Sequence, residues 1–131
     1  MNRARDLASG GRIADFAEDD DATATRRFYH APDLFGMKVG GRRYLGLIIG
    51  SGYQAHPLND GIEDRIYMMR MPDVASPPLN ADDEPSYTTL TEADLFDTTD
   101  NLIQQGEDES DKSDAAEALS TSDGWFIRLE R

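Results

Sequence analysis

Ser51, His56 and Asp60 are the side chains whose types could support catalysis. A serine hydroxyl acts as a nucleophile when a histidine takes its proton and an acid orients that histidine. The spacing of these three matches no nucleophile elbow, which places the serine at a sharp turn between a strand and a helix. His30 is the only other histidine. We therefore interpret His56 as a loop histidine bonded to nearby backbone, and we expect no catalytic residue.

The glycine-rich run Gly50-Ser51-Gly52 could bind a phosphate if a helix N-terminus followed it. It follows the apolar run Tyr44–Ile49 and precedes Tyr53-Gln54-Ala55-His56-Pro57, which does not begin a helix. The run therefore predicts a bulge or a tight turn at the end of a buried strand.

Acidic runs could bind calcium through hard oxygen ligands, and Asp19–Asp21 and Glu107–Glu109 are the candidates. A calcium loop alternates its ligands and has a glycine at its sharp turn, and neither run does. Asn59–Asp64 comes nearest, but it is better explained as a turn. Cysteine is absent, which excludes disulfides and thiolate metal sites. We expect no cofactor and no metal.

The formal charge of −13 is distributed unevenly along the 131 residues. Between Met71 and Ile127 there are 15 acidic residues and one basic residue, Lys112, so the rest of the chain is close to neutral. Nucleic acids and anionic membranes attract clustered Lys and Arg, so we exclude both as partners. No apolar run reaches the roughly 20 residues that span a bilayer, and we see no signal peptide.

Short strands are predicted for the first half of the chain. Arg27–His30 reads as a strand stopped by Pro32, because proline cannot donate to a central ladder. Phe35–Lys38 leads into Gly40-Gly41, a hairpin signal. Tyr44–Ile49 is apolar at every position except Gly46 and predicts an inner strand covered on both faces, followed by another strand at Ile66–Met71.

The second half predicts an acidic helical and loop insertion, residues 77–121, within a single domain of residues 1–131. Thr89 and Glu92 fit a capping box, and the helix it starts would continue to Gly106. Ser113–Leu119 predicts a second helix. The chain then returns to a strand at Trp125–Leu129, whose apolar face would consist of Trp125, Ile127 and Leu129.

The order and spacing of several short motifs resemble the C-terminal β-propeller of the PilC/PilY type IV pilus biogenesis proteins. They are Arg26-Arg27-Phe28-Tyr29, the run from Ser51 to Leu58, Asp64-Arg65-Ile66-Tyr67-Met68, Thr91–Asp97 and Gly124–Leu129. The positions that carry the resemblance are Phe28, Tyr29, Pro32, Asp33, Gly50, Ser51, Gly52, Tyr53, His56, Pro57, Asp64, Arg65, Tyr67 and Trp125.

The expected fold class is therefore mainly β with a helical insertion: a partial β-propeller of about one blade plus neighbouring strands, since a full ring needs roughly 40 to 50 residues for each of several blades. Asp64 is expected to accept backbone amides at a turn, Arg65 to pair with carboxylates, and Trp125 to pack. All three roles are structural.

The resemblance implies a non-enzymatic fragment of a pilus biogenesis or tip-adhesin protein that acts in pilus assembly, retraction control or adhesion. Its partners would be other pilus components or the missing blades. Its location would be the cell surface, the pilus or the periplasm. Members of the family have a calcium-binding loop, and we do not find that loop in this sequence.

Two alternatives remain open at this point. Quinoprotein dehydrogenases also use propellers, but their cofactor needs a complete ring with a metal and an acidic base. The other alternative is a standalone acidic domain that forms homo-oligomers to complete its sheets.

Overall fold

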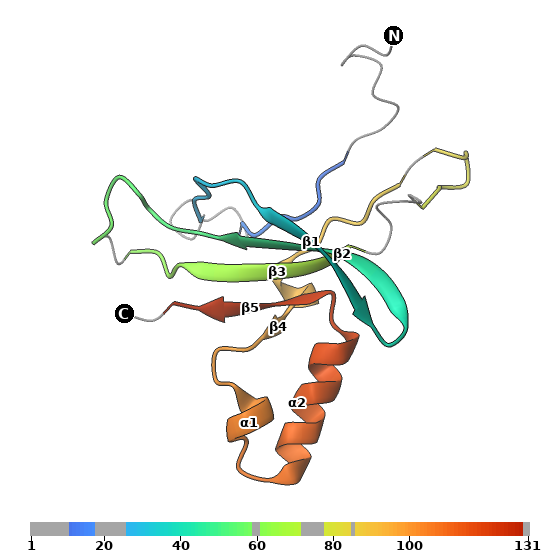
Figure 1. Cartoon of the computed structure of the whole chain (residues 1–131). Coiled ribbons are helices and arrows are strands. Elements are labelled where there is room, and N and C mark those ends of the chain that lie inside the picture. The colour runs from blue at the N-terminus through green and yellow to red at the C-terminus, as the bar shows by residue number, and fades with distance from the viewer. Residues whose placement is uncertain (1–10, 18–25, 59–60, 72–77, 85, 130–131) are drawn as a thin grey trace.

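The computed structural model describes residues 11–17, 26–58, 61–71, 78–84 and 86–129, and its centre is an open mixed sheet (Figure 1). The strand order is β1-β2-β3-β5-β4. The strands are β1 (Asp33–Val39), β2 (Arg42–Gly50), β3 (Arg65–Met71), β4 (Phe96–Asp97) and β5 (Gly124–Arg128). The helices α1 (Leu102–Gln105) and α2 (Glu109–Thr121) lie together beyond β5. The mainly β class with a helical segment is confirmed.

The predicted hairpin joins β1 to β2. Gly40 and Gly41 form its two-residue turn with φ angles of 57° and 84°. Both angles lie in the left-handed region that glycine enters without steric cost, and they match the twist of the flanking strands. The register pairs Val39 with Arg42 and continues to Asp33 opposite Ile48.

Four strands form a continuous antiparallel run. β2 pairs with β3, placing Leu47 beside Met69, and β3 pairs with β5, placing Tyr67 beside Phe126. β4 alone runs parallel to its neighbour β5. The inner strand predicted from Tyr44–Ile49 is confirmed as β2, which has a partner on each side.

The hydrophobic core lies on one face of this sheet. Leu47, Tyr67, Met69 and Phe126 point into it, and Leu95 joins them from the segment before β4. The ring of Phe16 stacks on Tyr67 at 4.0 Å between centroids, covering the same face. Tyr67 is fully buried, and its neighbours on the face are nearly so.

The strand and the alternation predicted for β5 are present, but the side that enters the core is that of Phe126, and the apolar side of Trp125 and Ile127 faces away from it. Phe126 is 8% exposed and belongs to the core, whereas Leu129 is 41% exposed. The register decides this, because the position opposite Tyr67 must share its face. Alternation shows which residues share a side, but it does not show which side the rest of the chain covers.

The helix predicted to start at Thr89 is replaced by a single 3-10 turn, η2 (Glu92–Asp94). Its cap is Thr91, whose backbone N–H and hydroxyl both donate to Asp94. The chain then becomes extended, because Leu95 enters the core and Phe96-Asp97 pairs with β5. Tertiary packing has overridden a local helix signal.

The two true helices differ from their predicted bounds. α1 is one turn that ends at Gly106, as predicted, while α2 begins at Glu109, four residues before the expected start. Asp108 caps α2 by accepting a bond from the N–H of Asp111 at 2.9 Å. Such a cap satisfies one of the free amides of the first turn.

Arg70 of β3 connects α2 to the sheet. Its guanidinium donates to the carbonyl oxygens of Leu119, Ser120 and Ser122 at 2.9, 3.2 and 3.1 Å. A cation at a helix C-terminus also complements the negative end of the helix dipole. Arg70 is only 9% exposed, so these contacts fix the end of α2 against the strand.

The strand predicted at Arg27–His30 is absent: these residues are irregular, and a strand begins just after Pro32. Proline is compatible with this place because it stands where no ladder bond is needed. Ala14 forms an isolated parallel β-bridge with Leu90. Asp19–Asp21, Asn59 and Asp60 lie outside the described residues.

Candidate functional site

Many of the positions that carry the resemblance to pilus propellers (the signature residues) lie together at one end of the sheet. Gly50 ends β2 and Ser51 follows it, Asp64 precedes β3, and Tyr29 comes from the segment before β1. Together they enclose a cavity of about 330 Å³, whose lining consists of Tyr29, His30, Gly50, Ser51, Gly52, Tyr53, Gln54, Pro57 and Asp64. Residues that the resemblance singled out are thus brought together from three places in the chain.

Ser51 organises this end of the sheet. Its hydroxyl donates to Asp64 at 3.1 Å and accepts the N–H of Arg65 at 2.9 Å. Its own N–H donates to the Arg65 carbonyl, and the N–H of Gly52 donates to the carbonyl of Arg27. Both hydrogen-bonding roles of the hydroxyl are therefore used locally. The arrangement closes the β2–β3 connection and does not present an activated nucleophile.

Tyr53 lines this cavity, and His56 contacts Tyr53 without lining the cavity itself. Their rings meet edge to face at 4.9 Å, and the N–H of His56 donates to the Tyr53 carbonyl at 3.0 Å. The guanidinium of Arg27 lies over the Tyr53 ring at 4.0 Å from its centroid, a favourable cation–π contact. His56 is exposed, and it is a loop residue whose backbone bond and ring contact are both to Tyr53.

Glu92 is the centre of a second cluster, the carboxylate cluster, which consists of Arg26, Glu63, Arg65, Tyr67 and Glu92. The Glu92 carboxylate accepts from Arg26 at 2.9 Å, and also from Arg65 and from the hydroxyl of Tyr67. Arg65 makes a further ion pair with Glu63 at 3.0 Å. The expected pairing of Arg65 with carboxylates is present.

Burial shapes the acid–base properties of this cluster. Burial raises the pKa of Tyr67 far above its ordinary value, and the bond to Glu92 adds to the effect. Burial alone would lower the pKa of Arg65, but the attraction of Glu92 raises it. Both groups, Tyr67 and Arg65, thus keep their protons near neutral pH.

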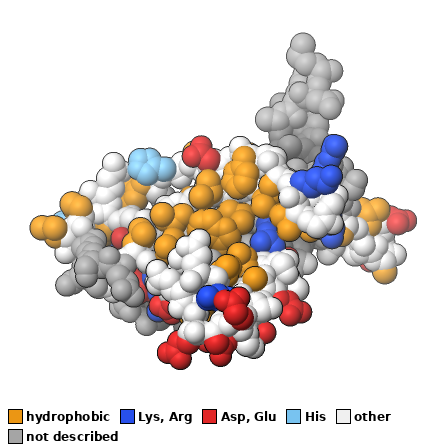
Figure 2. Space-filling model, turned by 60° about the horizontal axis from the view of Figure 1, so that its bottom comes forward, with side chains coloured by type: hydrophobic (Ala, Val, Ile, Leu, Met, Phe, Trp, Pro, Cys, Tyr) orange, Lys and Arg blue, Asp and Glu red, His pale blue; other side chains and the backbone are white. Residues whose placement is uncertain are grey.

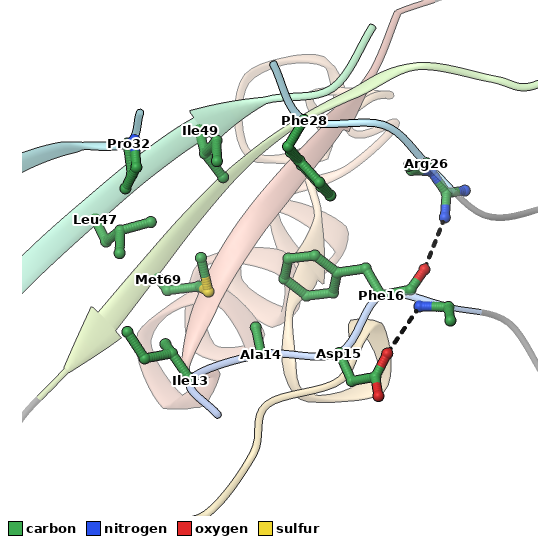
Figure 3. Close-up of a pocket in the computed structure, with 11 residues that line it drawn as sticks. Ile13, Ala14, Asp15, Phe16, Arg26, Phe28, Pro32, Leu47, Ile49 and Met69 are labelled. Carbon is green, nitrogen blue, oxygen red and sulfur yellow. Dashed lines mark hydrogen bonds between the residues drawn. The ribbon is translucent and has the colours of Figure 1, made fainter. Parts of the chain in front are cut away.

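A second cavity, of about 360 Å³, lies over the core face beside segment 13–17 (Figure 3). Leu47, Ile49 and Met69 form its floor, and Phe16 forms part of its wall. Arg26 donates to the Phe16 carbonyl at 3.4 Å, and Asp15 pairs with Arg12. Its two charged lining residues are therefore engaged, and the remaining lining is almost entirely apolar.

The opposite side of the sheet, the outer face, is also apolar. The registers place on it Phe35, Met37, Ile48, Ile66, Met68, Trp125 and Ile127. Of these only Met68 is buried, and Phe35 is 39% exposed. Figure 2 shows hydrophobic side chains gathered in the middle of the molecule, with acidic side chains along the lower rim. Contiguous apolar surface of this kind marks interaction sites.

The acidic rim comes largely from α2 and its flanks. The exposed carboxylates there are Glu107, Asp108, Glu109, Asp111, Asp114, Glu117 and Asp123. Lys112 is the one basic residue of the segment, and it pairs with Glu109 at 2.9 Å. A patch of this sign next to an apolar face suits a partner with basic side chains.

In the described ranges no three His, Cys, Asp or Glu residues are arranged to hold a metal ion. No helix in the same ranges is long and apolar enough to cross a membrane. No family model, curated protein or solved structure matches the chain. The likeness to pilus propellers therefore depends on the sequence motifs alone.

The remaining signature residues lie away from the cavity where β2 ends and β3 begins, which we call the strand-end cavity. Phe28 contacts Phe16 and Tyr67 with ring centroids 6.5 and 6.1 Å apart, and Pro32 lines the core-side cavity. Asp33 begins β1 and is exposed, while Trp125 is half-buried on the outer face. Asp64 accepts the Ser51 hydroxyl, where backbone amides were expected.

Sequence reasoning missed the role of Glu92, which it treated as a helix cap. The available signal was the excess of arginine near the apolar segments, since a buried arginine needs a carboxylate. Arg26, at 8% exposed, was such a residue, but its partner lies 66 positions away and could not be identified from spacing.

Proposed function

We propose that the chain supplies one blade of a PilC/PilY-like pilus propeller and acts by contact, without bond chemistry. The observation that carries this proposal is the four-strand run β1-β2-β3-β5 with apolar side chains on both faces. A propeller blade is a sheet of four antiparallel strands, each covered on both faces by its neighbours. The partners are then other blades or other pilus components at the cell surface or in the periplasm.

The β3–β5 connection is longer than that of a simple blade, and the proposal explains it as an insertion. In a simple blade the third and fourth strands are joined by a short turn, whereas here residues 72–123 intervene and return to the same place in the sheet. Long insertions in surface connections are tolerated because loop-closure entropy grows slowly with length. The added strand β4, parallel to β5, is a departure that belongs to this insertion.

The acidic helices project from the sheet and are suited to select a partner by charge. They cannot be tested by deleting residues 77–121, because that deletion would also remove Glu92 and Leu95, which pack with the sheet. The pair Asp114→Asn and Glu117→Gln removes two exposed charges and leaves every contact of the core. Weaker binding is expected wherever the partner is basic.

Co-sedimentation with sheared type IV pili tests the proposal. The chain should pellet with the fibres, and Trp125→Ser should reduce binding at least tenfold, because Trp125 is the largest side chain of the outer face. Leu58→Ser is the matched control, since Leu58 is 91% exposed and lies in the loop between β2 and β3, outside the sheet. Circular dichroism checks that each variant is folded.

Failure of the wild-type chain to pellet with pili would refute a pilus role. Equal binding by wild type and Trp125→Ser would refute the outer face as the contact surface. Unchanged binding by the Asp114→Asn, Glu117→Gln variant would show that these charges of α2 do not contribute to the choice of partner.

A further inference from the structure

The backbone of β1 presents an open row of hydrogen-bonding groups. Ser51, at the end of β2, donates to the carbonyl of Arg65, so the odd residues of β2 bond to β3. Antiparallel strands alternate the direction of their bonds, so the even residues of β2 bond to β1. Their partners in β1 are Asp33, Phe35, Met37 and Val39. The groups left pointing outward are those of Leu34, Gly36 and Lys38.

Nothing in the described part of the chain covers this edge. β1 has a strand on one side only, and no described backbone group outside the sheet bonds to Leu34, Gly36 or Lys38. All three are exposed, and a Cβ built on Gly36 would meet no atom within 4 Å. A seven-residue edge of this kind is a template for a further strand.

The charge distribution favours a second copy of this chain as the added strand. Residues 26–58 carry five basic side chains and one acidic side chain, Asp33. The acidic segment of α2 and its flanks, beyond β5, carries the exposed carboxylates Glu107, Asp108, Glu109, Asp111, Asp114, Glu117 and Asp123. Two sheets joined through β1 keep their acidic segments at the far ends, where screening weakens the repulsion. Joining through β4 would bring those segments together.

We propose that two copies associate through β1 in antiparallel orientation, with the twofold axis at Gly36, to form one continuous sheet. Leu34 and Lys38 of one copy then exchange backbone bonds with Lys38 and Leu34 of the second copy. The absence of a side chain at Gly36 lets the two strands approach at the axis.

Side chains are compatible with this register. Phe35 lies opposite Met37 of the second copy, both on the outer face, where aromatic and sulfur side chains pack favourably. Asp33 lies opposite Val39 of the second copy, next to the hairpin end that carries Lys38 and Arg43. The two hairpin ends lie at opposite ends of the joint, so their like charges stay apart.

Light scattering coupled to size-exclusion chromatography over a wide concentration range tests the proposal. The wild-type chain should pass from monomer to dimer and no further, because each copy has one β1 edge. Gly36→Pro replaces an outward N–H with a ring and should weaken association at least tenfold, since proline is tolerated at an edge but cannot donate. Gly36→Ala keeps the N–H and should associate as wild type does.

Amide hydrogen exchange on the wild-type chain tests the same joint without a variant. The amides of Leu34, Gly36 and Lys38 should exchange more slowly at high protein concentration than at low. A monomer at every concentration, unaltered exchange in a dimer, or a folded Gly36→Pro chain that still dimerises would each overturn the proposal. None of these results depends on binding to pili.

Discussion

Glu92 joins three parts of the chain that are distant in sequence. It accepts bonds from Arg26 before β1 and from Arg65 and Tyr67 of β3, and it lies itself in the turn before β4. Arg26 extends the connection by donating to the carbonyl of Glu63 at 3.2 Å. With a side chain 18% exposed, Glu92 acts in a partly dry environment where charge pairs are weakly screened.

Replacing Glu92 by Gln should lower the free energy of unfolding by about 2 to 4 kcal/mol, because two guanidinium groups would lose their shared counter-charge in a mostly buried place. Urea unfolding followed by circular dichroism measures the change. Glu109→Gln is the matched control: Glu109 is 92% exposed in its pair with Lys112, and its loss should cost less than about 0.5 kcal/mol. Equal small losses from both would show that the cluster contributes little to stability.

At the scale of elements, the sequence predicted β1, β2, β3 and β5, but it placed a strand wrongly at Arg27–His30, missed β4 and predicted the central helical region poorly. Gly40-Gly41 specifies a turn on its own, and the apolar run of β2 is long enough to indicate an inner strand. Thr89 to Ile103 carries a helical pattern, yet Leu95 and Phe96 are extended because the core and β5 bind them. Contacts between segments distant in the sequence determine this extended conformation, and the periodicity of the apolar residues does not reveal such contacts.

The candidate site was likewise predictable from the sequence only in part. The strand-end cavity was foreseeable in part, because Ser51-Gly52-Tyr53 and Asp64 flank one connection and must lie close together. The carboxylate cluster was not, because its members come from three segments that are distant in the sequence. Which face of β5 is buried likewise depended on its register with β3.

β4 is attached to β5 by a compact network around Asp97. Asp97 pairs with Arg128 at 2.7 Å and accepts from the N–H and hydroxyl of Thr99, which in turn accepts the N–H of Arg128 at 2.9 Å. Burial would raise the pKa of Asp97, but the bonds from Thr99 and the charge of Arg128 lower it below the ordinary value of 3.8.

A lowered pKa in the folded state gives Asp97 a stabilising effect that is complete above the unfolded value of 3.8 and is lost as the pH falls through the folded value. Wild type should therefore exceed Asp97→Asn in stability by a constant amount above about pH 5, and the difference should shrink below about pH 4. Urea unfolding at a series of pH values measures it. Thr99→Val should reduce the acid-dependent part, and a difference that stays constant into strong acid would contradict the role of Asp97.

At the scale of the whole molecule, charge and apolar surface are separated. The acidic side chains of α2 and its flanks lie beyond β5, the basic hairpin belongs to the opposite edge, and the outer face lies between them. The β1 edge and the outer face are therefore distinct surfaces, and a second copy and a different partner could occupy them together.

Trp125, the one tryptophan of the chain, separates these two surfaces experimentally. It lies on the outer face of β5, and β2 and β3 separate it from β1, a distance of roughly 14 Å at about 4.8 Å between strands. Dimerisation through β1 should leave its fluorescence maximum and its quenching by iodide unchanged across the whole concentration range. Covering of the outer face by a partner should shift the emission to shorter wavelength and reduce quenching, because the half-exposed ring would lose water. A blue shift that grows with protein concentration alone would mean that copies meet face to face, and the edge-to-edge dimer would then be wrong.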